Sequence, residues 1–337
     1  MLTARRLILV ASLLGAARSL AQPSPVAPAP VAAAVAVVAP LPEIPKYRFV
    51  INNLTVIRYN ALGIEDQIRA GLQLRLYDGE GALKRDNFVF IGLAPKLNPA
   101  FIKFGPSIEL QPVAAVNLRV AGEVVEFFST FGFLQSFQSP AALYSDTALR
   151  SGQWVEKNYA TSGLHFIVEP LIQMQLGPIA VRNRFSAEYW RMSTRASDPT
   201  EPVRTDPVFY DATLDTLVPA SGWVVADDLD VIWTRRLADG GRFAAGLRYS
   251  MVKPLYDSAS YLAGEDASAV PDNSHHRLGP VLLWTLYDRG FTRFNKPTVL
   301  LISGWYLHHR YRTGTDSSQA IPYVVLGFSF QSDLGSH

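Results

Sequence analysis

The chain has 337 residues, of which 48% are hydrophobic and 18% charged, and it contains no cysteine, so disulfides cannot stabilise its fold. Its formal net charge of +2 includes three arginines within the first 21 residues. Removing those three from the 31 basic residues leaves 28 against 29 acidic ones, a balance that gives no reason to expect a nucleic-acid partner.

The first 21 residues have the parts of a secretory signal peptide. Arg5 and Arg6 form a basic start, residues 7–16 form a short apolar run, and residues 19–21 offer a cleavage site. An uncleaved membrane anchor is the alternative, but the run is shorter than the roughly 20 residues that a spanning helix needs. We therefore expect cleavage after Ala21.

Residues 22–45 are rich in proline, alanine and valine and offer little to bury in a core. This composition predicts an extended linker, which would lie in the periplasm after export. Later in the chain, charged or polar residues interrupt every apolar run before it reaches the length of a membrane-spanning helix.

From residue 46 onward, apolar and polar side chains alternate with a period of two. In the segment 164–176, Phe166 and Val168 fall on one face and His165 and Glu169 on the other. Successive side chains of a strand point to opposite faces, so each such strand has one apolar and one polar face. We predict twelve strands, at 46–58, 65–77, 87–96, 100–112, 114–134, 160–176, 179–193, 221–237, 241–254, 274–288, 296–312 and 320–331.

The connections between these strands differ in length at the two ends. With both termini in the periplasm, every inner turn is short, and the three long connections, 135–159, 194–220 and 255–273, all fall on the outer side. This asymmetry is typical of barrels that present apolar side chains to lipid and polar side chains to a lumen. The predicted fold is all-β: a transmembrane antiparallel up-and-down β-barrel of about twelve strands, with short periplasmic turns and long extracellular loops.

Aromatic residues sort toward the ends of the predicted strands. Amphipathic rings favour the headgroup level of a membrane, so two aromatic girdles are expected. The predicted interface aromatics are Tyr189, Trp190, Trp223, Trp233, Trp284, Tyr287 and Tyr311.

In the last strand, Phe328 and Phe330 alternate with Gly327 and Ser329. Here the chain resembles Gram-negative outer-membrane barrel proteins, whose final strand ends in an aromatic residue. The resemblance covers residues 46–331 and implies a location in the outer membrane of a Gram-negative bacterium. It also implies that the barrel-assembly machinery reads this strand during insertion. Residues 332–337 would form a C-terminal tail.

Some parts of the chain do not fit the predicted pattern. Asp227 falls on an apolar face, which a bulge near Ala226 or a strand end standing in water would explain. Residues 50–59 and 123–133 do not alternate well. Residues 207–217 either form one arm of a hairpin above the membrane or show that the count of twelve is wrong.

The charged residues of the polar faces are predicted to line the lumen. They are Arg69, Arg75, Lys103, Glu109, Glu169, Arg182, Arg184, Glu188, Asp228, Asp230 and Arg248. About eight strands leave a filled interior and 16–18 an open channel, so twelve strands allow two interpretations. We favour a narrow passive pore for small polar or anionic solutes. The alternative is a non-conducting structural or surface-interaction barrel, with charges that pair and fill the lumen.

The long outer loops offer further roles. Loop 135–159 is aromatic enough to fold into the lumen or to form a lid, and loops 135–159, 194–220 and 255–273 would meet any surface partner. The acidic residues of 255–273 lack the spacing of a calcium-binding loop.

An outer-wall lipid hydrolase is a weaker hypothesis. It would use His276 or His309, but Ser303 lies about 20 Å from His309 along the strand, too far for proton transfer. We therefore predict no enzyme, no catalytic residue, no metal site and no cofactor. The remaining expected partner is the lipid of the outer membrane.

Overall fold

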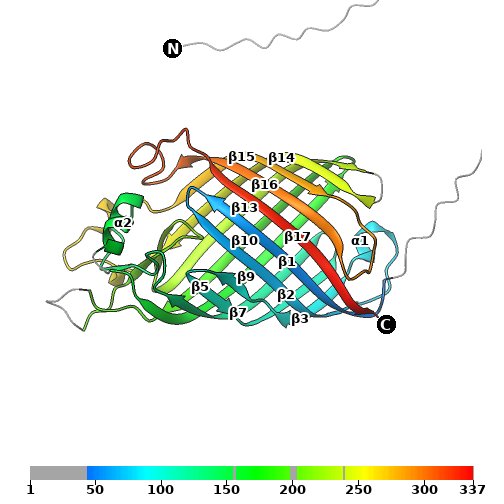
Figure 1. Ribbon diagram of the computed structural model, residues 1–337, viewed down its shortest axis with the longest axis horizontal. Helices are drawn as coiled ribbons and strands as arrows, with labels where there is room; N and C mark the ends of the chain where they lie inside the picture. Colours follow the sequence, from blue (N-terminus) through cyan, green and yellow to red (C-terminus); the bar gives the residue numbers. More distant parts are fainter. Residues whose placement is uncertain (1–43, 155–156, 198–202, 238–239, 337) are drawn as a thin grey trace, which may run out of the picture. The chain divides into compact units, whose positions relative to one another are not determined.

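Twelve antiparallel strands close into a barrel in the computed structural model, which describes residues 44–154, 157–197, 203–237 and 240–336 (Figure 1). The predicted signal peptide and nearly all of the predicted linker lie outside the described residues. β1 (Tyr47–Tyr59) pairs with β2 (Gly63–Leu74) on one side and with β17 (Tyr323–Ser336) on the other, which closes the ring. The predicted fold class and strand number are therefore confirmed.

The other wall strands follow β2 around the ring nearly in chain order. They are β3 (Phe88–Leu93) with β4 (Lys96–Asn98), β5 (Phe101–Phe104) with β6 (Pro106–Val113), β7 (Val116–Phe128), β9 (Ala160–Leu176), β10 (Ile179–Met192), β13 (Ser221–Arg236), β14 (Arg242–Leu255), β15 (His275–Thr285) and β16 (Asn295–His308).

Two wall strands are each broken in two. Pro95 separates β3 from β4, since proline has no N–H to give to the ladder. Gly105 separates β5 from β6, and a side chain at this position would collide with the carbonyl oxygen of Gly122 on β7. These breaks divide two predicted strands without changing their place in the ring.

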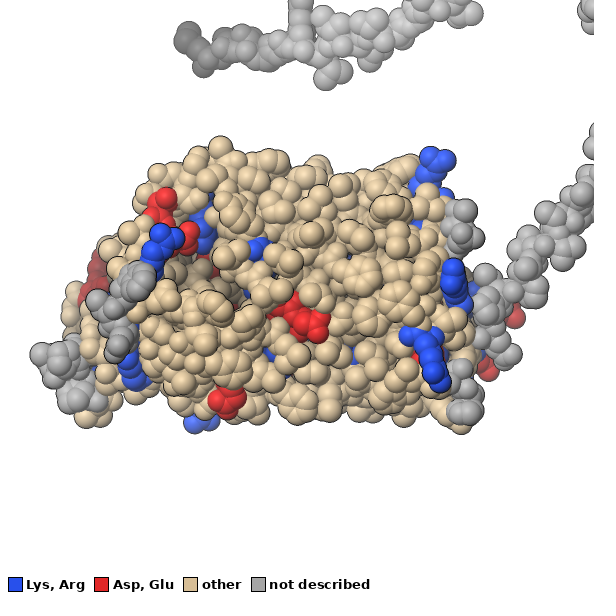
Figure 2. Space-filling view, in the orientation of Figure 1, with Lys and Arg blue, Asp and Glu red and all other residues tan. Residues whose placement is uncertain are grey.

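The outer face of the wall is apolar. Phe166, Leu247 and Phe328 point outward and expose 41%, 56% and 40% of their surface, whereas Glu169 and Arg182 point inward. In Figure 2 the wall is almost free of charged residues, which gather toward its two ends. An apolar cylinder with a polar interior is the arrangement that a barrel in lipid requires.

The two ends of the barrel differ as predicted. β9 and β10 are joined at the inner end by two residues, and Gly177 there has a φ of 58°, which glycine adopts without strain. The long connections at the outer end hold α2 (Asp146–Trp154), and α1 (Gly81–Arg85) lies at the opposite end (Figure 1). No helix in the described part of the chain is long and apolar enough to cross a membrane.

β17 continues past the predicted strand end at residue 331. Ser332 pairs with Ile51 and Asp333 with Val50 in the same register as the residues before them, and Arg48 binds Asp333 at 3.2 Å. The prediction of a separate tail from residue 332 is therefore wrong as far as residue 336. Among residues 331–336 only Leu334 has a large apolar side chain, which is why the sequence pattern did not reveal the extension.

Two acidic residues face outward near the middle of the wall. Asp227 accepts a hydrogen bond of 2.7 Å from Asn183 on the neighbouring strand, and the register between β10 and β13 has no bulge. The bulge considered for Asp227 is therefore excluded, and a hydrogen bond from the neighbouring strand satisfies its carboxylate. On the opposite side of the ring, Asp66 accepts hydrogen bonds from Asn53 at 2.8 Å and Thr55 at 2.6 Å. Figure 2 shows an acidic spot of this kind amid the uncharged wall.

Candidate functional site: a plugged lumen

A β-hairpin occupies the outer part of the lumen. β11 (Val208–Asp211) pairs with β12 (Thr216–Pro219), and β8 (Ser136–Phe137) adds a third short strand. Every residue of β11 and β12 is buried. We call residues 208–219 the plug. Of the two alternatives for residues 207–217, a wrong strand count is excluded. The segment forms both arms of a hairpin instead of one, the hairpin lies inside the barrel, and loop 135–159 joins it there through β8.

Apolar side chains of the wall turn inward to meet the plug. Phe209 and Val218 of the plug pack into a buried cluster with Phe101, Val125, Phe127, Leu134, Trp190, Met192, Val224 and Val252. The ring of Trp190 lies 5.5 Å from that of Phe209. Residues 123–133 alternate poorly because their inward side chains meet an apolar plug there instead of water.

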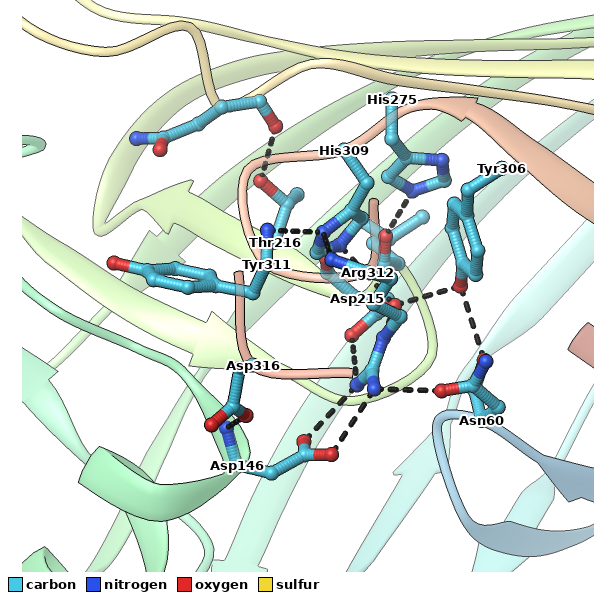
Figure 3. Close-up of polar contacts among 12 residues, drawn as sticks. Asn60, Asp146, Asp215, Thr216, His275, Tyr306, His309, Tyr311, Arg312 and Asp316 are labelled. Carbon is cyan, nitrogen blue, oxygen red and sulfur yellow. Dashed lines mark hydrogen bonds and ion pairs between the residues drawn. The ribbon is translucent and has the colours of Figure 1, made fainter. Parts of the chain in front are cut away.

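Asp215, in the turn between β11 and β12, fixes the plug to the barrel (Figure 3). Its carboxylate accepts hydrogen bonds from Tyr306 at 2.7 Å, from Tyr210 at 2.8 Å and from Arg312 at 2.6 and 2.9 Å. Arg312 also binds Asp146, the first residue of α2, at 3.1 Å. One carboxylate thus links the plug to β16 and to two outer loops.

His309 completes this cluster. Its Nδ1 accepts from the backbone N–H groups of Tyr311 and Arg312, which leaves Nε2 as the protonated nitrogen, 3.3 Å from the Asp215 carboxylate. Burial alone would raise the pKa of Asp215, but His309 and Arg312 outweigh it and hold the pKa well below the usual range of an aspartate. Asp215 is therefore ionised at neutral pH.

The plug also contacts other strands around the ring. These contacts are Lys103 with Asp211 at 3.9 Å, Arg58 with Thr213 at 3.3 Å, and His275 with the backbone oxygen of Leu214 at 2.7 Å. Because β1, β5, β15 and β16 all touch it, the plug spans the lumen instead of lying along one wall.

A polar chamber begins beneath the tip of the plug. A cavity of about 280 Å³ is lined by Asp211, Thr213 and Leu214 of the plug and by charged wall residues. It shares Arg119 and Arg184 with a second cavity of about 420 Å³. A third cavity of about 560 Å³ lies at the inner end, beside α1. The cavities follow one another from the plug to the inner end of the barrel.

The chamber wall carries charges in register across neighbouring strands. In one row, Arg182, Asp230 and Arg248 lie opposite each other, and both arginines donate to Asp230 at 2.6 to 2.9 Å. The next row runs from Arg184 through Asp228 and Ser250 to Arg277. Charges at matching positions on adjacent strands can pair directly.

A second buried network lies on the other side of the chamber. His165 is held between Glu123 at 3.1 Å and Glu188 at 2.9 Å, and its ring stacks on Trp190 at 3.8 Å. Lys96 binds Glu123 at 2.8 Å. This arrangement holds the imidazole ring rigidly beneath the apolar part of the plug.

The predicted lumen-lining residues are placed almost entirely inside the barrel. Facing inward are Arg69, Lys103, Glu109, Glu169, Arg182, Arg184, Glu188, Asp228, Asp230 and Arg248. Arg69 pairs with Glu109, and Arg119 with Glu169. Arg75 lies just beyond β2 at the inner end, where it binds Asp78 at 2.7 Å.

The predicted interface aromatics divide into two groups. Tyr189 and Trp223 contact each other with ring centroids 5.2 Å apart, Trp233 and Trp284 are exposed, and Tyr287 is half-buried. Trp190 and Tyr311 are wrong predictions, because both are buried. Adjacent residues of a strand face opposite ways, so Trp190 cannot share the outward face of Tyr189. Tyr311 lies beyond β16 and packs on Tyr144 at 4.7 Å.

His309 does not face lipid either. β16 ends at His308 after a register shift opposite His276, and His309 then turns inward to the plug. His276 remains on the outward face and contacts Tyr249 at 2.6 Å. The outer-wall role considered for His309 is therefore wrong.

Sequence reasoning missed the residues that hold the plug. Asp215 lies in a predicted outer loop, and Tyr306 and Arg312 fall on the predicted strand 296–312, whose inward face carries few charges. The available signal was the run of apolar and aromatic residues at 207–217, which is too rich in such residues for a solvated loop.

No protein-family profile matches the sequence, and no curated protein matches it. Similar solved structures include the β domain of the Bordetella autotransporter BrkA, at 11% identity and a TM-score of 0.43, with 86% of this chain and 100% of that chain covered. They also include OmpT of Vibrio cholerae (8% identity, TM-score 0.30, 86% and 99% covered). OccD3 of Pseudomonas aeruginosa is a third (10% identity, TM-score 0.27, 87% and 92% covered).

These similarities are too weak for any function to be transferred to this chain. The resemblance to Gram-negative outer-membrane barrels holds at the level of the fold class, and a location in the outer membrane stays a prediction. Cleavage after Ala21 remains a prediction.

Proposed function

We propose that this protein is an outer-membrane barrel that is closed at its outer end in the resting state and presents a charged chamber to the periplasm. The burial of both strands of the plug carries this proposal. A water-filled passage beside the plug would leave some of its side chains accessible, and those of β11 and β12 are not. We therefore favour a non-conducting barrel over an open pore.

The energetics of the plug support closure. Moving it away would break the hydrogen bonds that Tyr306 and Arg312 donate to Asp215, and a hydrogen bond to a charged group contributes about 1.5–3 kcal/mol. A cost of 3 kcal/mol alone would keep open molecules below about 1% of the population. Loss of the apolar contacts of Phe209 and Val218 adds to that cost.

Single-channel recording in planar bilayers tests the proposal. The purified wild-type barrel should show no steady conductance. A variant in which a short Gly-Ser linker replaces residues 208–219 should give stable steps. The matched control shortens residues 258–269, an equally long outer segment that includes both 3₁₀ helices, and should stay silent.

A narrow passive pore is the second candidate. One observation favours it: Arg69 and Arg184 face inward, yet 37% and 44% of their side chains remain accessible, so the inner lumen holds space for water. Steady conductance of the wild type, altered by Arg182→Glu or Arg248→Glu, would support this candidate and overturn closure. Binding of a surface partner by the outer loops stays a prediction.

A further inference from the structure

We propose that the chamber holds a binding site for a small oxyanion, a phosphate or a carboxylate group, centred on Arg277. This inference deepens the proposed function. It rests on that function only in assuming that the ligand enters the chamber from the periplasmic side. Arg277 lies on β15 and lines both the 280 Å³ cavity beneath the plug and an adjoining cavity of about 70 Å³. Arg277 therefore lies where these two cavities meet.

Arg277 differs from its neighbours in having no acidic partner. Arg119 and Arg248 each form an ion pair with a carboxylate, but no carboxylate of the described residues pairs with Arg277. Its Nε is buried and lacks a hydrogen-bond partner. A buried N–H without an acceptor is costly, and a bound anion would satisfy it.

Two tyrosines hold the guanidinium in place. It lies 3.9 Å from the ring centroid of Tyr323 and 5.6 Å from that of Tyr306. Stacking on an aromatic face is favourable for a cation, yet it leaves the donors at the edge of the guanidinium unused. Those donors form a planar fork that matches two oxygens of a phosphate or carboxylate.

The acid in the same row as Arg277 is already engaged by other side chains. Asp228 is the acidic residue in the row that runs from Arg184 to Arg277. Its carboxylate accepts a hydrogen bond from Ser250 at 2.6 Å and pairs with Arg248 at 3.4 Å. Arg184, at the far end of the same row, lines the same cavity. Two arginines thus flank one aspartate that is already paired. The size of the cavity limits the ligand to a small molecule.

Isothermal titration calorimetry of the full-length barrel in a non-ionic detergent tests the site. The probes are inorganic phosphate and succinate, in separate titrations, which distinguish the two sources of the oxyanion. We expect saturable binding of at least one probe and a loss of at least tenfold in affinity for Arg277→Gln. Arg277→Lys keeps the charge but not the planar fork, so it should retain part of the affinity.

Arg289→Gln is the matched control, because the Arg289 guanidinium also stacks on a tyrosine, Tyr287 at 4.2 Å, but lies at an inner turn outside the chamber cavities. It should bind as the wild type does. Heat-modifiable migration on a gel establishes that each variant is folded. If Arg277→Gln does not fold, the ³¹P line width of phosphate with the wild type and with Arg277→Lys provides the comparison.

Absence of saturable binding to the wild type, or equal binding by folded Arg277→Gln, would overturn the site. The detergent titration does not depend on whether the plug is closed. Steady conductance of the wild type would therefore reject the proposed closure without touching the binding result, and the two failures can be told apart.

Discussion

Asp215 and Arg312 lie 97 positions apart in the chain and meet inside the barrel, where Arg312 donates to both carboxylate oxygens of Asp215 at 2.6 and 2.9 Å. Asp215 belongs to the long loop after β10, and Arg312 to the loop after β16. The ion pair therefore joins loops from distant parts of the ring and holds the plug across the lumen.

Replacing Asp215 should weaken this connection strongly. Asp215→Ala leaves the Arg312 guanidinium buried with one acid, Asp146, which is itself half-exposed, so we expect the free energy of unfolding to fall by about 3–5 kcal/mol. Urea titration in lipid vesicles, followed by gel migration, measures this change. Asp316→Ala, at an exposed acid of a neighbouring loop, should cost less than about 1 kcal/mol. Equal stability of the two variants would contradict the role given to Asp215.

The contribution of Asp215 should depend on pH in one direction. Its pKa is lower in the folded barrel than in the unfolded chain, so its stabilisation is complete above the unfolded value of about 4 and is lost as the pH falls through the folded value. The difference in urea midpoint between wild type and Asp215→Asn should stay constant from pH 7 to 5. It should shrink only below about pH 4. A difference that disappears near pH 6 would show that another group controls the plug.

Asp230 should matter more than its neighbour Asp228. Asp230 is fully buried and shared by Arg182 and Arg248, whereas a third of the Asp228 side chain is exposed. Asp230→Ala should lower the free energy of unfolding by about 3–5 kcal/mol, because two inward cations lose their common acceptor. Adding Arg182→Ala should recover part of that loss in a double-mutant cycle. If the two changes are simply additive, the bonds between these side chains contribute little.

Trp190 offers a test of the apolar core inside the barrel. It is completely buried between His165 and Phe209, so Trp190→Ala should cost about 3–5 kcal/mol. Trp233→Ala, at an outward tryptophan of the wall, should cost clearly less. The same urea titration compares them. A larger loss for Trp233 would mean that the plug is not packed against Trp190.

The wall of the barrel was predictable because it follows one local rule. Side chains such as Phe166 and Glu169 alternate with a period of two. Apolar side chains then face the lipid, and polar side chains face the lumen. The same rule places Arg182, Asp230 and Arg248 inside, although their pairing in one row depends on register, which the alternation alone does not fix.

The plug was not predictable in the same way. Its contacts join residues far apart in the chain, such as Asp215 with Tyr306 and Arg312, and no local pattern encodes them. The error at His309 has a local cause, since a register shift between β15 and β16 disturbs the alternation just before it.

The outward Asp227 leads to a prediction about the lipid face. Asn183→Leu alone should destabilise the barrel, because it removes the donor that satisfies Asp227 at 2.7 Å. The double change Asn183→Leu with Asp227→Leu removes both polar groups from a wall that faces hydrocarbon, so it should raise the free energy of unfolding in vesicles by up to about 2 kcal/mol. Val181→Leu, at an outward apolar position of the same strand, is the control and should have little effect. A double variant less stable than the wild type would show that this face contacts something other than lipid.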